Sequence, residues 1–489
     1  MSQQVAVGPK MARRALVMFI GKTAAIVLSL VAAALIPRQL GPRGMGFYSY
    51  FYSSVFTIVC ILDVGGSMLL RRYVPEFLTH RRAEVRPLFL ASLRAKLLVL
   101  MVFAVVTPLV SDPGMFGLVL IAAACSSMVE SVQTLLYAGG ALGSYAAVSA
   151  VVTALRILLV LLLAPRFQRI GISLALVMSA AITIAVFIMP AVRVLPPSRE
   201  RLSQSYWRFL RFGLVSYGAD LAFVLSNRVA LILGRHMMDD MAELGYLGVA
   251  FMVYLLARQL AFFIGETSIP SLVHYHASGE RTQFARTMHH VWRYTTIVVF
   301  AAAALIICYA EALVLAIVGP VFAKTAVLIR LLVPAFAAMT LTLCVRIALF
   351  AQEKSFRLLV AHGGALIAFV VMVGGWWLVR PPMTSEAIAL AFSLSSVVGF
   401  ALMAFHSGTG VSGTTLLVSV VKPIIAAILV CQSIRVIGPQ GPWLVASVPL
   451  ALVGYLLVLL VIRGLERRDW HRVMGLMGRS TGKDENWAS

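Results

Sequence analysis

Long apolar runs recur along almost the whole chain, and they decide what it can fold into. Of its 489 residues, 61% are hydrophobic and only 12% are charged, whereas a soluble protein carries roughly 25% charged residues. About 20 apolar residues are enough for one helix to cross a bilayer. Fourteen runs of this kind are bounded by Pro, Gly or Arg, near residues 15–36, 46–70, 89–110, 115–137, 142–164, 170–192, 209–232, 244–266, 291–317, 325–350, 357–379, 385–406, 415–437 and 443–463.

These runs predict an all-α polytopic membrane protein with about 14 transmembrane helices. In lipid, every backbone polar group must be hydrogen-bonded within the protein, which leaves helices and closed barrels. Barrel strands alternate apolar and polar residues, and these runs are continuously apolar. Since no polar stretch is long enough for a separate soluble domain, nucleotide-binding domains are excluded and we expect no cofactor.

The basic residues indicate how the chain is oriented in the membrane. If the N-terminus is cytoplasmic, 23 Lys and Arg residues lie in or beside cytoplasmic connections and 8 lie in external ones. The positive-inside rule then places both termini in the cytoplasm, in the cell inner (plasma) membrane. The net charge of +22 is therefore mainly an orientation signal, and we expect no nucleic-acid partner.

An internal repeat predicts two lobes. Leu40-Gly41 and Gly46-Phe47-Tyr48 recur as Leu233-Gly234 and Gly245-Tyr246-Leu247. Because six spans separate the copies, the repeat is parallel, and we expect two six-helix lobes around a central cavity. The expected division is an N-lobe at 1–200, a C-lobe at 201–406, and two extra C-terminal helices with a tail at 407–489.

Ionisable residues inside the spans are candidates for function, since each costs about 2.5 to 3.5 kcal/mol at the bilayer centre on insertion scales. An excess of basic over acidic groups suits an anionic ligand, and a guanidinium group can bind two phosphate oxygens at once. The candidate substrate-binding residues are Arg258, Arg156, Arg346, Lys22 and Arg228, and the candidates for Na⁺ or H⁺ coupling are Asp63, Glu130 and Asp220.

Two of these assignments have a structural alternative to a role in binding substrate or ions. Lys22 and Asp63 form a structural ion pair or line the cavity, and Arg228 lies near enough to a span end for its side chain to reach the interface. Arg258 is the strongest cavity candidate because it lies far from both interfaces. The five cysteines all fall within spans and have no metal-ligand spacing, so we expect packing roles for them and no metal site.

Several motifs resemble those of the polysaccharide flippases of the multidrug/oligosaccharidyl-lipid/polysaccharide exporter superfamily. They are Leu40-Gly41-Pro42-Arg43-Gly44-Met45-Gly46-Phe47-Tyr48-Ser49, Leu62-Asp63-Val64-Gly65, Arg72-Tyr73-Val74-Pro75-Glu76 and, in the second lobe, Leu349-Phe350-Ala351-Gln352 before Lys354. The resemblance covers both lobes. The sequence departs from it at Asn227-Arg228, where many members have Asp-Arg.

The resemblance implies a transporter and not an enzyme. Its substrate would be a polyprenyl-diphosphate-linked oligosaccharide, moved from the cytoplasmic to the outer leaflet, and its other contacts would be membrane lipids. One alternative is a lipid II flippase of the same superfamily. A second, from another class, is a membrane glycan polymerase or ligase, and a third is a docking subunit among glycan synthesis and polymerase proteins.

Overall fold

The computed structural model describes residues 9–109, 112–197, 206–266, 272, 275–276, 278–352, 354–406, 413–437 and 443–461. Every regular element in this part is a helix. The elements are α1 (Pro9–Asp63), α2 (Gly66–His80), η1 (Arg82–Glu84), α3 (Val85–Val106), η2 (Thr107–Leu109), α4 (Pro113–Ala138), α5 (Leu142–Val192), α6 (Tyr206–Met237), α7 (Met241–Glu266), α9 (Arg281–Ile317), η3 (Pro320–Phe322), α10 (Thr325–Ala351), α11 (Ser355–Val379), α12 (Ser385–His406), α13 (Gly413–Ile437) and α14 (Trp443–Val461).

The all-α, multi-pass prediction is confirmed. Ten helices in the described part are long and apolar enough to cross a membrane. Two of them, α1 and α5, each consist of two helical segments, because Gly41 (φ 65°) and Gln168 (φ 48°) interrupt the helical backbone. Large apolar side chains such as Val105 and Leu378 are more than three-quarters exposed, which suits lipid and not water. The count of fourteen spans stays a prediction.

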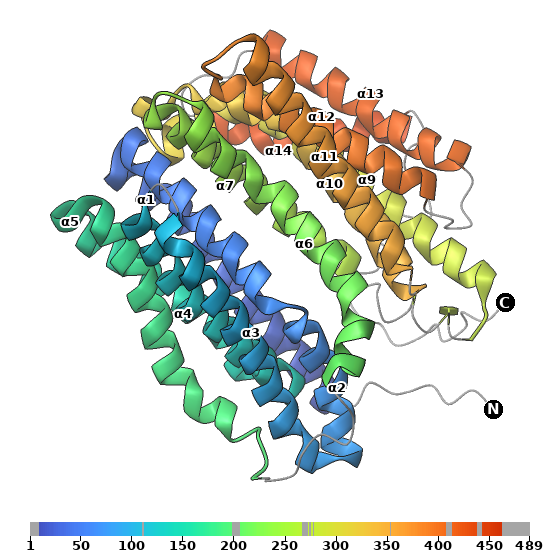
Figure 1. Ribbon diagram of the computed structural model, residues 1–489. Coiled ribbons are helices and arrows are strands. Elements are labelled where there is room, and N and C mark those ends of the chain that lie inside the picture. Colours follow the sequence, from blue (N-terminus) through green and yellow to red (C-terminus); the bar gives the residue numbers. More distant parts are fainter. Residues whose placement is uncertain are drawn as a thin grey trace.

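The helices form two groups that meet along α1 and α7. In Figure 1, α1 to α5 lie on one side and α6 to α14 on the other. One buried apolar cluster is built only from residues of the first group, two only from the second, and the largest draws on both. We call these groups the first half and the second half. The domain boundaries at 200 and 406 stay predictions.

The last two helices pack on the outside of the second half. The Tyr455 hydroxyl donates to the Ile297 carbonyl at 3.0 Å, and the Tyr309 hydroxyl donates to Ser447 Oγ at 2.7 Å. These bonds join α14 to α9, and α13 packs beside both. The two cavities between the halves that are described below involve neither α13 nor α14.

One end of the bundle holds the interruptions of α1 and α5 and the connection from α6 to α7. Together they line a cavity of about 600 Å³ that includes Gln39, Gln168 and Asp239. We call this the turn end. Here Arg38 donates from α1 to the Ala316 carbonyl on α9 at 2.5 Å, so the two halves are in contact at this end.

Two glycines allow the halves to meet closely at the turn end. A Cβ atom on Gly46 would lie 2.0 Å from the Met241 carbonyl oxygen, and one on Gly245 would lie 1.9 Å from the Pro42 carbonyl oxygen. Since both distances are far below van der Waals contact, only glycine fits at either position. Gly46 and Gly245 are also the residues that the internal repeat pairs, so equivalent positions of the repeat meet face to face.

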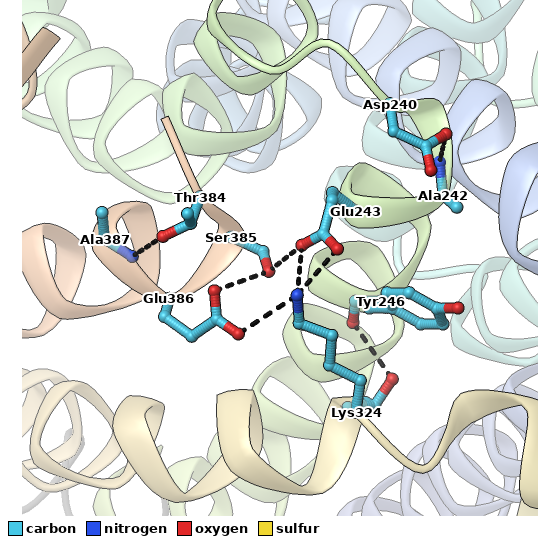
Figure 2. Close-up of polar contacts among 10 residues, drawn as sticks. Asp240, Ala242, Glu243, Tyr246, Lys324, Thr384, Ser385, Glu386 and Ala387 are labelled. Atoms are coloured by element: carbon cyan, nitrogen blue, oxygen red, sulfur yellow. Dashed lines mark hydrogen bonds and ion pairs between the residues drawn. The ribbon is translucent and has the colours of Figure 1, made fainter. Parts of the chain in front are cut away.

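A charged network fixes the turn end of the second half. Figure 2 shows the Lys324 ammonium between Glu243 on α7, at 2.7 Å, and Glu386 on α12, at 3.2 Å, while Ser385 Oγ donates to Glu243 at 2.6 Å. Burial lowers the pKa of Lys324, but the hydrogen bonds to the two carboxylates outweigh this and raise the pKa above its ordinary value. The network therefore ties the first turn of α7 to α10 and α12.

We predict that Gly46→Ala forces the halves apart at the turn end, because the added methyl group would overlap the Met241 carbonyl. Spin labels at Gln39 and Asp239, which line the same cavity, should report a longer distance. The control is Gly117→Ala in α4, where a Cβ atom meets nothing within 4 Å. An unchanged label distance in Gly46→Ala would show that the glycine contact does not set this closure.

Candidate functional site

A cavity of about 140 Å³ lies where α1, α5, α6 and α7 meet between the two halves. We call it the guanidinium cavity. Its polar lining comprises Ser29, Tyr48, Ser49, Tyr52, Ser53, Arg156, Arg228 and Gln259, and apolar side chains such as Leu255 and Phe251 complete it. Because both halves supply residues, any relative movement of the halves reshapes this cavity.

Two arginines share one aromatic ring in the guanidinium cavity. The Cζ atoms of Arg156 and Arg228 lie 4.9 Å and 5.3 Å from the centre of the Tyr52 ring, and Arg228 also lies 4.8 Å from the ring of Phe56. A guanidinium over an aromatic face gains roughly 0.5 to 2 kcal/mol. The rings therefore offset part of the cost of placing two positive charges within the membrane.

Arg156 is too deep to reach water along its own helix. It lies 14 residues after the start of α5 and 12 before the interruption at Gln168, which is about 20 Å of helix on either side. Its Nε is buried without a hydrogen-bond partner. An unpartnered buried donor costs about 1 to 3 kcal/mol, more when it is charged. The Tyr52 hydroxyl bonds to the guanidinium, whereas the Nε–H of Arg156 has no acceptor among the described residues.

Two serines add further unused donors. Ser49 and Ser53 lie one turn apart on α1, line the guanidinium cavity, and are 5% and 0% exposed. Neither hydroxyl has a hydrogen-bond partner among the described residues. Two guanidinium groups and two free hydroxyls around one cavity form the donor set that an oxyanion such as phosphate requires.

No carboxylate of the described residues neutralises these arginines. Within the part of the chain that the structure describes, Arg156, Arg228 and Arg258 form no ion pair with Asp or Glu. A unit negative charge 4 Å from a guanidinium gains about 4 kcal/mol at an effective dielectric constant of 20. The cavity thus favours an anionic ligand and disfavours a cationic one.

The predicted carboxylates gather in a second cavity of about 280 Å³, also between the halves, which we call the carboxylate cavity. It is lined by Asp63, Glu130, Asp220, Arg71 and Arg346, together with Phe56 and Phe223. Phe56 also lies beneath Arg228, so the two cavities are neighbours separated by aromatic rings.

Two of the three carboxylates have a basic partner. Asp220 forms an ion pair with Arg346. Asp63 lies 2.9 Å from Lys96 Nζ, which also donates to Ser131 Oγ at 2.9 Å. Asp63 accepts from the backbone N–H and hydroxyl of Ser67 as well, which caps the start of α2.

Glu130 differs from the other two carboxylates. Among the described residues, no hydrogen bond or ion pair is found for its side chain. Within the described part of the chain, its carboxylate is therefore the one in this cavity without a salt bridge, and Lys96 and Arg71 act on it only at longer range.

Arg258 lies between the two cavities. Its Nη1 donates to Asn227 Oδ1 at 2.9 Å, and its Cζ is 4.9 Å from the Phe223 ring and 5.9 Å from the Tyr254 ring. It lines neither cavity itself. A role for Arg258 toward substrate therefore stays a prediction. The side chain of Lys22 lies outside the described residues.

The structure thus divides the residues that the sequence had grouped together. Arg156 and Arg228 share one cavity, while Arg346 joins Asp63, Glu130 and Asp220 in the other. The ion pair of Asp63 is with Lys96, a residue that the sequence analysis missed although it lies within the apolar run 89–110. The sequence does not point to Ser49 or Ser53 as site residues, because a Ser in a span is usually satisfied by its own helix. It marks Asn227 only as a departure from the flippase pattern.

The fold and its sequence motifs together decide the family. Residues 11–276, more than half of the chain, match the family model described as polysaccharide biosynthesis protein. The chain belongs to the polysaccharide biosynthesis protein family. This confirms the resemblance inferred from the motifs around Gly46 and Asp63. A search of curated protein sequences finds no match.

Solved structures share the fold of this polysaccharide biosynthesis protein. Lipid II flippase MurJ in an inward closed conformation has a TM-score of 0.72 at 12% identity, over 94% of this chain and 100% of that chain. An inward-facing multidrug resistance MATE family transporter of the MOP superfamily has a TM-score of 0.57 at 12% identity, over 84% and 98%. The MATE multidrug transporter DinF-BH, solved as a complex, has 0.59 at 14% identity, over 83% and 97%.

We predict that Lys96→Met strongly destabilises the protein, because it leaves the Asp63 carboxylate buried without its cation. The two side chains are 8% and 11% exposed, and breaking such a pair costs about 3 to 5 kcal/mol. The double variant Asp63→Asn with Lys96→Met should recover much of the loss. The thermal unfolding midpoint of the purified protein measures both effects, and a single variant as stable as the parent would contradict the pairing.

Proposed function

We propose that this protein is a flippase that moves a polyprenyl-diphosphate-linked oligosaccharide from the cytoplasmic to the outer leaflet by alternating access. The observation that carries the proposal is the guanidinium cavity. Among the described residues, its Arg156 and Arg228 have no carboxylate partner, and its Ser49 and Ser53 hydroxyls have no acceptor. A diphosphate offers several charged acceptor oxygens to such a donor set.

The two cavities suit different parts of this substrate. The diphosphate is anionic and fits the arginines beside Tyr52, whereas a glycan is polar and largely uncharged. Sugar hydroxyls both donate and accept, which suits the carboxylate cavity, where Glu130 lies beside Arg71 and Tyr217. The apolar side chains Leu255 and Leu256 at the guanidinium cavity offer a surface to the first part of the polyprenyl chain, whose remainder can stay in lipid.

Alternating access needs a closure that can open at each end. The basic residue count places the turn end outside the cell. We assign the external closure to the close contact of Gly46 with α7 together with the bond from Arg38 to the Ala316 carbonyl, and opening this end has to part both. The network of Lys324 keeps α7 with the second half as a rigid unit during that movement.

The membrane potential supplies a driving force. Moving a diphosphate of charge about −2 outward across an inside-negative potential releases about 4.6 kcal/mol per 100 mV. The chain contains no GxxxxGK[ST] motif for binding a nucleotide. Glu130 is the remaining candidate for an additional coupling proton or Na⁺ ion, because Asp63 and Asp220 are engaged by Lys96 and Arg346.

Removing either cavity arginine should reduce flipping. We expect Arg156→Gln and Arg228→Gln to lower the rate roughly 10- to 100-fold, the equivalent of one charged hydrogen bond, and Arg156→Lys to lower it less because the charge remains. Vesicles that contain a fluorescent polyprenyl-diphosphate glycan would report the rate. The matched control is Arg330→Gln. Arg330 is an exposed arginine on α10 that lies beside Glu311 of α9. Equal rates in Arg156→Gln and Arg330→Gln would refute the assignment.

Flipping should also respond to voltage. In the same vesicles, a potential that is negative on the side of the labelled lipid should accelerate its transfer to the opposite leaflet, and the reverse potential should slow it. The physical reason is the net charge of the diphosphate. Equal rates at both polarities, with the proton and Na⁺ gradients removed, would contradict an electrically driven mechanism.

A further inference from the structure

One face of α6 binds two arginines, one through a carboxylate and the other through an amide. Asp220, Phe223 and Asn227 lie three and four residues apart on this helix, which places them on one stripe. Arg346 from α10 binds Asp220, and Arg258 from α7 binds Asn227. Both guanidinium groups lie against the same Phe223 ring, at 5.2 Å and 4.9 Å.

Asn227 makes three side-chain hydrogen bonds on this stripe. It is 4% exposed. Its Oδ1 accepts from Arg258 Nη1 at 2.9 Å and from the Tyr254 hydroxyl at 3.1 Å, while its Nδ2 donates to the Phe223 carbonyl at 2.6 Å. These three bonds fix the orientation of the amide and, through it, the position of the Arg258 guanidinium.

The two partners have opposite electrostatic consequences. The Asp220 carboxylate cancels the charge of Arg346, so this pair contributes little net potential beyond its own contact. The Asn227 amide is neutral, so Arg258 keeps its full positive charge. Arg258 binds Asn227, which directly precedes Arg228 on α6, and its own neighbour Gln259 lines the guanidinium cavity.

We infer that Asn227 is a positioning residue that sets the charge preference of the guanidinium cavity: it holds Arg258 in place without neutralising it. This inference rests on the proposed function. Arg258 is then a third positive charge that acts on the ligand, from behind Arg228. A carboxylate at residue 227 would neutralise Arg258, so the amide at this position is the feature that favours a multiply charged anion.

The test changes the charge of each partner, Asn227 and Asp220, in turn. Asn227→Asp keeps the acceptor for Arg258 and adds a negative charge, and Asp220→Asn removes the negative charge beside Arg346. The probe is inorganic diphosphate, titrated at pH 8 onto the purified full-length protein in lipid nanodiscs. We expect a change of one unit charge beside the guanidinium cavity to alter the affinity for diphosphate roughly tenfold.

We expect Asn227→Asp to weaken diphosphate binding about tenfold with the unfolding midpoint near that of the parent, and Asp220→Asn to leave binding as tight or tighter. If Asn227 only stabilises the fold, Asn227→Asp would bind diphosphate like the parent, because an aspartate also accepts from Arg258 and Tyr254. That result would overturn the inference.

In Asn227→Asp, the second carboxylate oxygen would face the Phe223 carbonyl oxygen, and this repulsion can prevent folding. Arg258→Gln tests the inference in that case. Arg258→Gln should weaken binding by a similar factor, because it also removes one unit of positive charge. Unchanged affinity in Arg258→Gln would also overturn the inference. Failure of the proposed function itself looks different: the parent would not bind diphosphate, or Arg156→Gln would bind it as tightly as the parent does.

Discussion

Unneutralised positive charge inside the membrane is the constraint on which the rest of this structure depends. Arg156 and Arg228 have no carboxylate partner among the described residues, and aromatic rings from α1 are what they contact instead. Aromatic faces offset only part of the desolvation cost. The remaining cost persists in the empty protein and is relieved when an anion enters, which makes the site selective for negative charge.

The arrangement of the helices follows from this constraint. Arg156 comes from α5 and Arg228 from α6, and the rings that they contact come from α1, so the charged site lies where the two halves meet. Carboxylates lie close by but are held by Lys96 and Arg346. If either carboxylate were released toward Arg228, it would neutralise the site. The rings of Phe56 and Phe223, which separate the two cavities, are therefore as important for the positive charge of the guanidinium cavity as the arginines themselves.

Much of the fold could be predicted from the sequence, since apolar runs and basic connections follow directly from the physics of the bilayer. Most of the buried charges were also visible, because an Arg or Asp within a run such as 142–164 stands out, but Lys96 in the run 89–110 was missed. Their partners were not, because Asp63 and Lys96 are brought together by tertiary packing and not by spacing. The unpartnered state of Ser49 and Ser53, and the neutral contact of Asn227 with Arg258, depend on side-chain geometry that no periodicity encodes.

The central claim is that the guanidinium cavity binds the diphosphate of a lipid-linked glycan, and a structure of the protein determined with such a lipid bound tests it most directly. The account predicts phosphate oxygens within hydrogen-bonding distance of Arg156 and Arg228, with the hydroxyls of Ser49 and Ser53 as further donors. Phosphate density beside Arg71 in the carboxylate cavity, or beside Arg43 and Arg169 at the turn end, with the guanidinium cavity empty, would contradict it.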